Sequence, residues 1–271
     1  MRILTYNCCA LPLLTGDIGR RLTLAAESIL GLDPELILLQ EIFLTEQFAA
    51  VRSGLPRWPH AAWERRSFSR VAGGLCLLSK RPIRRWGFVS FAVQGPAWRF
   101  SALTRLSPKG FLWAEFEAPA VLVVHTHLVA DYRIGLEGRN PYPQAQAAQL
   151  GQIEAHLRPH GGAAPMVVAG DLNMKPDAPA LRRFLDILRL SDAMGQAAPP
   201  SVIEEPYYRL PFFGAPNRRF DYVLFRGLAD RATAEYVLRE RPLTRGGRGI
   251  TLSDHLGVLA ELHEQPSRRR S

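Results

Sequence analysis

The sequence predicts an α+β protein in which a few helices pack on the outer faces of β-sheets. Many short apolar runs have the length of strands, whereas three segments have helical spacing, and the two kinds alternate irregularly along the chain. With 271 residues, of which 47% are hydrophobic, the chain is long enough to bury a substantial core. No repeat, low-complexity tract or long linker interrupts it.

Each element follows from a local pattern. Residues 17–31 space their apolar side chains as one face of a helix does and end at Gly31. Residues 34–41 form a wholly apolar run that ends in Gln-Glu, as is typical of a strand buried on both faces. Two more helices are expected near 143–157 and 178–188. The other expected strands cover residues 2–7, 73–80, 87–93, 110–118, 120–128, 165–173, 220–225, 233–238 and 255–262.

The net charge and the cysteine content indicate which partners and which cellular compartment to expect. The net charge of +9 favours anionic partners such as nucleic acids, phosphorylated metabolites or acidic lipid surfaces. Almost all of this charge is arginine, a bias that also follows from genome composition, so it names no particular partner. Cys8, Cys9 and Cys76 make a poor disulfide framework and fit a reducing compartment, where small buried side chains are expected rather than redox chemistry. No run is long enough to span a bilayer, and Asn7 and Pro12 interrupt the apolar start, so a cytoplasmic protein is expected.

Polar residues gather where the apolar runs end or begin. Asn7 closes the first strand, Glu41 the second, and Asp171 and Asn173 follow the run at 165–169. A further five lie at the ends of later runs, namely His125, His127, Asp221, Asp254 and His255. If the strands lie side by side, these side chains meet in one cleft. Carboxylate and amide oxygens suit Mg²⁺ or Mn²⁺, with room left for a substrate phosphate.

Each of these residues also has an ordinary structural interpretation. Asn7 could form a turn, Glu41 could be a solvated strand end, and Asp171 with Asn173 could be an Asx turn. Because His125 and His127 are two apart, they share one face of a strand, which suits a zinc pair or one core and one surface histidine. The set as a whole argues for a site, since independent turn formers need not follow so many strands in this order.

The segments LTYN, LLQEIF, THL, GDLNM, RRFDYVL and LSDH together resemble the ordered signature of the endonuclease/exonuclease/phosphatase superfamily. The resemblance runs from Arg2 to about Leu262. It implies a four-layer α/β/β/α sandwich of two mixed β-sheets flanked by helices. It also implies one catalytic domain over residues 1–264, followed by a basic flexible tail at 265–271. Members are Mg²⁺-dependent phosphodiesterases.

Within the superfamily, the sequence motifs of this chain are similar to those of the neutral sphingomyelinase branch. This likeness is carried by four segments, namely GGLCLLSKRPI, THLVADY, GDLNMKP and the LPFFG that precedes the Arg-x-Asp element. Members of the branch often have a second histidine two residues after the Thr-His pair, where this chain has Val129. The membrane-spanning C-terminal segments of some animal members are absent, so any peripheral membrane contact is expected from loops or charge.

The resemblance implies a role for each residue. Asn7 and Glu41 are expected to bind the metal, with Asp254 assisting at a second metal position or through water. Asp171 is the expected general base, and Asn173 would polarise the phosphate or hold the attacking water. The expected phosphate contacts are His127, the His255 imidazole oriented by Asp221, and Lys109. His125, offset from the motif, is expected to be structural.

The sequence leaves several functions open. A lipid hydrolase could meet a bilayer through the aromatic residues of 86–100 and 207–216, although a core strand and a loop plug explain them as well. The leading hypothesis is a monomeric sphingomyelinase-like phospholipid hydrolase.

A nuclease acting on DNA or RNA could use the arginines and aromatics of 57–70, which otherwise form a solvated basic loop. A non-catalytic scaffold on acidic membranes has no need for the full residue set. A dinuclear zinc phosphatase would carry Asp-x-His and Gly-Asn-His elements that are absent here.

Overall fold

The computed structural model describes residues 1–12, 15–67, 69–95, 108–131, 140–160, 164–203, 218–228, 231–239 and 251–263. The expectations for residues 96–100 and 207–216 and for the tail at 265–271 therefore lie outside the described residues. Among the described helices, none combines the length and the hydropathy that a membrane crossing requires.

Two six-stranded mixed sheets form the centre of the molecule. The first has the order β13-β14-β1-β2-β6-β3, and the second has the order β11-β12-β10-β9-β8-β7. Strands β1 and β2 are parallel, as are β9 and β10, and the remaining paired strands are antiparallel. The first sheet comprises β1 (Arg2–Asn7), β2 (Leu36–Gln40), β3 (His60–Ala62), β6 (Cys76–Ser79), β13 (Arg231–Val237) and β14 (Gly257–His263). The second comprises β7 (Arg85–Ser90), β8 (Gly110–Glu117), β9 (Ala120–His127), β10 (Met166–Asp171), β11 (Ser191–Asp192) and β12 (Asp221–Arg226).

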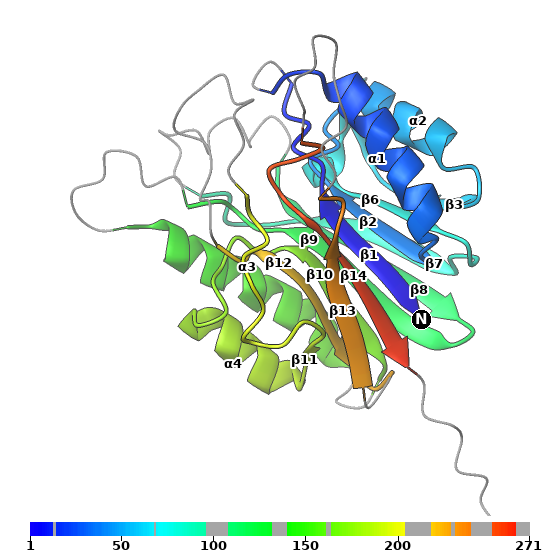
Figure 1. Ribbon diagram of the computed structural model, residues 1–271. Helices are drawn as coiled ribbons and strands as arrows, with labels where there is room; N and C mark the ends of the chain where they lie inside the picture. The colour runs from blue at the N-terminus through cyan, green and yellow to red at the C-terminus, as the bar shows by residue number, and fades with distance from the viewer. Residues whose placement is uncertain are drawn as a thin grey trace, which may run out of the picture.

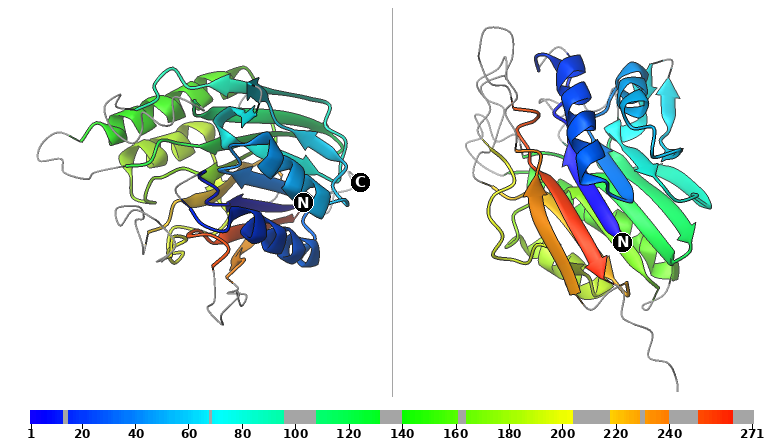
Figure 2. Two further views of the ribbon diagram at one scale, coloured as in Figure 1. Left: turned by 90° about the horizontal axis from the view of Figure 1, so that it is seen from above. Right: turned by 45° about the vertical axis from the view of Figure 1, so that its right-hand side comes forward.

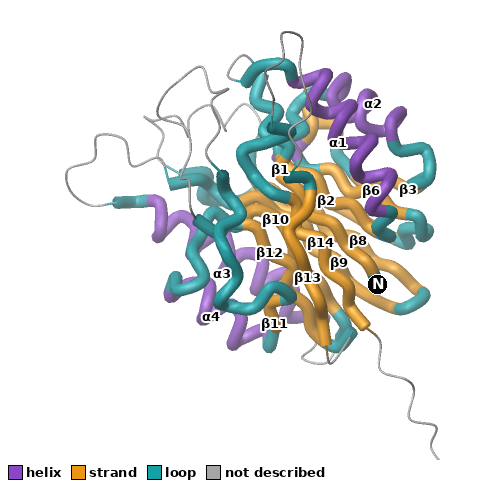
Figure 3. Tube along the Cα trace, in the orientation of Figure 1, coloured by secondary structure: helices purple, strands orange, loops and turns teal. Residues whose placement is uncertain are grey.

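Helices cover the outer faces of both sheets. Figure 1 and Figure 3 show α1 (Ile18–Leu32) and α2 (Thr45–Gly54) over the first sheet, and α3 (Tyr142–Leu157) and α4 (Pro179–Leu188) over the second. Seen from above in Figure 2, left, the two helix pairs lie on opposite sides of the strands. The expected four-layer α/β/β/α sandwich is therefore confirmed.

Strand alternation divides the apolar residues among three cores. Leu4 and Tyr6 of β1 face outward and pack with α1 and α2, whereas Ile3 faces inward. On the second sheet, Val124 and Val168 face outward and pack with α3 and α4, while their neighbours Val123 and Val167 join Ile3 between the sheets. Burial of both faces explains why these strands are almost continuously apolar. All three cysteines are buried and none of them forms a disulfide, which confirms the expectation of small buried side chains.

Several elements escaped sequence analysis. Helix α2 buries only Gln47, Phe48 and Val51 on its inner face, which is too short an apolar pattern to stand out. The stretch 57–70 contains β3 and the hairpin formed by β4 (Arg65–Ser67) and β5 (Arg70–Val71), whose charged sequence hides its strands. Residues 85–90 form β7, so a strand lies where one was expected, but it is an edge strand of the second sheet with exposed or half-buried side chains rather than a buried core strand. Helix α1 ends at Leu32, one residue beyond the expected Gly31.

The inward-facing positions become polar toward one end of the sandwich. On β1 the inward series is Ile3, Thr5 and Asn7, with Thr5 and Asn7 buried. Strand β9 turns His125 and His127 to this same face, and β10 ends there with Asp171. An apolar core between the sheets thus opens into a buried polar cluster at the carboxyl ends of the parallel strands.

Candidate active site

Asp171 lies at the centre of this polar cluster and is 1% exposed. Its Oδ2 accepts a hydrogen bond of 3.0 Å from the Asn7 Nδ2 and lies 3.4 Å from Nε2 of His127 and 3.8 Å from Nε2 of His255. Its Oδ1 accepts the backbone N–H of Asn173 at 2.8 Å. Burial raises the pKa of Asp171 to about 6, although the nearby His255 opposes the shift.

The backbone around Asp171 explains the glycine before it. Gly170 has φ +141°, and a Cβ at this position would lie 1.8 Å from the carbonyl oxygen of Thr126 on the neighbouring strand. Asn173 adopts φ +50°, and its N–H closes an Asx turn on Asp171. The turn and the site are therefore the same structure, because the turn holds one carboxylate oxygen and leaves the other facing Asn7 and the histidines.

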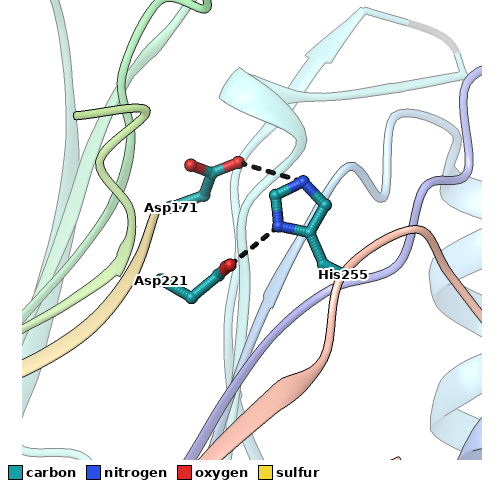
Figure 4. Close-up of side chains that lie close together, drawn as sticks. All are labelled: Asp171, Asp221 and His255. Atoms are coloured by element: carbon teal, nitrogen blue, oxygen red, sulfur yellow. Dashed lines mark hydrogen bonds and ion pairs between the residues drawn. The ribbon is translucent and has the colours of Figure 1, made fainter. Parts of the chain in front are cut away.

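His255 and Asp221 form the tightest ion pair of the cluster. Nδ1 of His255 lies 2.8 Å from Oδ2 of Asp221, and the Ser201 hydroxyl donates to the same oxygen at 2.6 Å. Burial alone lowers the pKa of His255, but the carboxylates of Asp221, Asp254 and Asp171 together raise it well above its ordinary value. Figure 4 shows the imidazole between the Asp221 and Asp171 carboxylates. The geometry favours a protonated imidazolium whose orientation Asp221 holds.

The buried group of Asp171, Asp221 and His255 is also compact enough to hold a metal ion, because its ligand atoms lie within 4.8 Å of one another. One feature favours proton chemistry instead. Nδ1 of His255 is already hydrogen-bonded to Asp221, and this contact leaves the other ring nitrogen, Nε2, on the side of Asp171.

Glu41 offers a better place for a cation. Its Oε1 lies 3.4 Å from Nδ2 of Asn7, whereas its buried Oε2 has no hydrogen-bond partner. Burial, together with the nearby charge of Asp254, raises the pKa of Glu41 to about 7. A buried carboxylate with an unsatisfied oxygen beside a second acid is stabilised by a hard divalent cation, so the residues present fit Mg²⁺ or Mn²⁺. Glu41 adopts φ +63°, an uncommon conformation for this residue type.

Asn7 connects the Glu41 side of the cluster with Asp171. Its Nδ2 faces both carboxylates, and its Oδ1 accepts the backbone N–H of Cys9 at 3.0 Å. Asn7 therefore orients the Asp171 carboxylate directly, a role that sequence analysis did not assign to it. The Oδ1 atom keeps a second lone pair, which can coordinate a metal ion.

Lys109 reaches the site from the second sheet. It is 3% exposed, and burial lowers its pKa to about 8 even though the carboxylates of Asp171 and Glu41 favour its charged form. The charges of both acids therefore act on this ammonium. The expected role of Lys109 as a phosphate contact stays a prediction.

His125 and His127 share the inward face but differ in surroundings. His127 borders Asp171, and burial lowers its pKa well below the usual range. His125 lies one layer deeper, where its Nε2 is 3.3 Å from Nε2 of Gln40, and burial lowers its pKa to about 3. The deeper position supports the expected structural role of His125.

Several site-supporting residues were missed by sequence analysis. Ser201 holds Asp221, and the Ser253 hydroxyl donates to the Asn7 carbonyl at 2.7 Å and accepts the His255 N–H at 3.1 Å. Gln146 of α3 donates to the carbonyls of Val129 and Asn173. Ser253 lies within the LSDH segment and could have been noticed, whereas nothing in the sequence links Ser201 to an aspartate 20 residues away.

Comparison with known proteins agrees with this arrangement. Residues 4–255 match the model of the Endonuclease/Exonuclease/phosphatase family. The chain belongs to this family. It is 26% identical over 294 residues to human sphingomyelin phosphodiesterase 2, an alignment that covers 100% of this chain and 67% of that protein. The inositol phosphosphingolipids phospholipase C of Schizosaccharomyces pombe is 26% identical over 186 residues, covering 65% of this chain and 42% of that protein. The chain spans 66% of a putative neutral sphingomyelinase of Caenorhabditis elegans.

Solved structures share the fold of this family member. Beta toxin from Staphylococcus aureus superposes with a TM-score of 0.77 at 19% identity, covering 97% of this chain and 100% of the toxin. Sphingomyelinase C from Streptomyces griseocarneus gives a TM-score of 0.72 at 21% identity, covering 97% of this chain and 99% of that enzyme. A mutant of the S. aureus toxin with bound magnesium ions gives 0.74 at 17% identity, covering 97% of this chain and 99% of the mutant.

Proposed function

We propose that this protein is a Mg²⁺-dependent phosphodiesterase, with Mn²⁺ as an alternative cation, that hydrolyses the head-group phosphodiester of a sphingomyelin-like phospholipid. The observation that carries the proposal is the Asp171 carboxylate, whose Oδ2 faces Asn7, His127 and His255 at once. A carboxylate held in this way beside a cationic imidazole suits activation of water next to a phosphate.

In the proposed reaction, Asp171 takes a proton from a water molecule as the water attacks phosphorus. The raised pKa brings this carboxylate closer to the pH at which it works as a general base. The attack forms one P–O bond and breaks the bond to the leaving alcohol, so that a diester and water become a monoester and an alcohol. Asn7 and the Asn173 N–H fix the carboxylate and thereby limit the orientations it must search.

The negative charge that grows on the phosphoryl oxygens requires fixed positive charge. His255, held protonated by Asp221, and Lys109 supply it from opposite sheets. His127 is a further phosphate contact, and Asn173 holds the water or polarises the phosphate. Glu41 and Asn7, with Asp254, would hold the divalent cation, which when bound neutralises phosphate charge and stabilises the transition state.

The substrate class rests on the relatives. Human sphingomyelin phosphodiesterase 2 and the S. pombe phospholipase C are both named for phosphosphingolipids, and the alignment with the human protein covers the whole of this chain, whereas that with the S. pombe protein covers 65% of it. These names support a sphingolipid head group for this chain as well. The basic surface supports contact with a lipid surface.

Hydrolysis of sphingomyelin vesicles and of an abasic-site DNA duplex, each with Mg²⁺ and with EDTA, tests the proposal. We expect wild-type protein to release phosphocholine only with Mg²⁺, and Asp171→Ala to lose this activity by a factor of about 10²–10⁴. Asp186→Ala, on the exposed side of α4, is the matched control and should behave as wild type.

Each alternative result has a definite meaning. Cleavage of DNA without release of phosphocholine would replace the lipid by a nucleic acid and keep the catalytic residues. Full activity in EDTA would refute the cation requirement, and full activity of Asp171→Ala would refute the assignment of the base.

A further inference from the structure

Arg21 of α1 is a buried cation outside the proposed catalytic set. It is 4% exposed, and all five of its guanidinium N–H groups are used. Nε donates to the carbonyl of Gly16 at 2.9 Å, and Nη2 donates to the carbonyl of Cys9 at 2.8 Å and the hydroxyl of Thr15 at 3.2 Å. Nη1 donates to the carbonyls of Cys8 at 3.0 Å and Leu252 at 2.8 Å.

These acceptors come from two segments that carry site residues. Cys8 and Cys9 directly follow Asn7, whereas Leu252 lies two residues before Asp254. One nitrogen, Nη1, therefore joins the segment that carries Asn7 to the segment that carries Asp254 and His255. Ser253 links the same two segments through the Asn7 carbonyl.

The contact at Cys9 leads directly to the Asn7 side chain. Cys9 adopts φ +49°, a conformation that is rare for residues other than glycine and needs support from its surroundings. Its carbonyl accepts hydrogen bonds from both Arg21 and Thr15, and its N–H donates to Oδ1 of Asn7. Loss of the carbonyl contacts would let Cys9 relax and turn the Asn7 amide away from Glu41 and Asp171.

The chemistry of the contacts requires a guanidinium. No carboxylate among the described residues forms an ion pair with Arg21, and the acceptors that they offer to its charge are four carbonyls and the Thr15 hydroxyl. A lysine has three donors on one nitrogen and cannot reach five acceptors spread over a plane. An apolar side chain would avoid burial of a charge, so a buried arginine at this position indicates a requirement for its fixed geometry.

We propose that Arg21 is a positioning residue, which sets the spacing between the Asn7 and Asp254–His255 segments and thereby the affinity for the divalent cation. This inference rests on the proposed function, because it takes Asn7, Glu41 and Asp254 as the cation ligands. Residues that orient metal ligands typically change metal affinity or activity by a factor of about 10–100 when they are replaced.

Calorimetric titration of Mg²⁺ or Mn²⁺ into wild type and Arg21→Lys tests the proposal without reference to any substrate. We expect the lysine variant to bind the cation about 10–100-fold more weakly and to show a lower kcat, partly restored by excess cation. Arg20→Lys, the same change at the exposed neighbouring position of α1, is the control and should keep the wild-type affinity. Urea unfolding of each variant establishes that the measured protein is folded.

The outcomes separate the two proposals. If wild-type protein binds no divalent cation, the proposed function fails. If wild type binds and folded Arg21→Lys binds equally well, only the inference about Arg21 fails. If Arg21→Lys does not fold, Thr15→Val decides, because it removes one acceptor of Arg21 and one support of Cys9 at nearly constant volume. A weaker cation affinity in Thr15→Val supports the positioning role, and an unchanged affinity refutes it.

Discussion

At the scale of single residues, the site consists of groups whose charge states are set by burial and by one another. Asp171 and Glu41 are acids with raised pKa values, whereas Lys109 and His127 are bases with lowered ones. Desolvation is the largest cause of the pKa shift in all four cases. The charged form of each group loses more stabilisation by leaving water than it regains from neighbouring charges and hydrogen bonds. Such mutual perturbation is typical of functional sites.

His125 provides a test of burial that is independent of catalysis. Its pKa is lowered to about 3 by burial, whereas a histidine in the unfolded chain titrates near about 6.5. As the pH falls through this interval, the unfolded state binds a proton that the native state does not. The free energy of unfolding should therefore decrease by up to about 1.4 kcal/mol per pH unit for this residue.

His125→Gln removes this titration and keeps a polar side chain beside Gln40. Urea unfolding between about pH 6.5 and about pH 4 should show a shallower loss of stability for the variant than for wild type. His127 still titrates in both proteins, so the slope decreases without vanishing. Equal slopes would mean that His125 accepts a proton in the native state.

At the scale of elements, strand ends carry the site and helices hold the loops that follow them. On the first sheet, Arg21 of α1 ties the segments after β1 and before β14. On the second, Gln146 of α3 ties the segments after β9 and β10 through the carbonyls of Val129 and Asn173. Each helix pair therefore both covers a core and fixes half of the site.

The close approach of β9 and β10 behind Asp171 makes Gly170 a sensitive position. An alanine Cβ would lie 1.8 Å from the backbone oxygen of Thr126, which cannot move without opening the ladder between the two strands. We expect Gly170→Ala to destabilise the protein by about 3 kcal/mol or more and to reduce activity in the folded fraction. Chemical denaturation measures the first effect.

Gly151 is the matched control for this substitution. It lies within α3, and an added Cβ would meet nothing within 4 Å. Gly151→Ala should therefore stabilise the protein by up to about 1 kcal/mol through helix propensity. A small effect of Gly170→Ala, comparable in size to this gain, would show that the strands can separate at little cost.

At the scale of the whole molecule, basic side chains lie at both ends of the sandwich. At the end away from the site, Arg2, Lys80, Arg84 and Arg85 all form ion pairs with acidic side chains. At the site end, the exposed Arg66 donates to the hydroxyl of Ser90, a neutral partner on the strand next to Lys109. No carboxylate among the described residues forms an ion pair with Arg66, so we propose that its charge is available to an anionic surface at this end of the molecule.

Charge reversal at Arg66 tests this arrangement. Each basic side chain near an anionic bilayer contributes about 1 kcal/mol to binding at low ionic strength. Arg66→Glu should therefore weaken binding to vesicles that contain acidic lipid by about tenfold or more, with less effect at high salt. Vesicle sedimentation at two salt concentrations gives the measurement. Arg84→Glu at the far end is the control and should bind as wild type, and equal binding of both variants would contradict the arrangement.

The sequence by itself determined the long strands, the class of fold and the residues that end these strands, because alternation and apolar runs are local properties. It also carried the family signature, which the match over residues 4–255 confirms. It did not reveal α2 or β3–β5, whose apolar patterns are too short or too charged. Local patterns are strongest where burial is continuous, and these elements lie at the margin of the core.

Only the tertiary structure decided which residues meet. Asn7 and Asp171 are 164 positions apart, and their hydrogen bond exists because β1 and β10 belong to sheets that pack face to face. Four side chains support the site through backbone carbonyls and carboxylates of distant segments, namely those of Ser201, Ser253, Gln146 and Arg21. No spacing of residues along the chain predicts such contacts. Strand order and sheet packing set these distances, since they arise from burial of the whole core rather than from any local pattern.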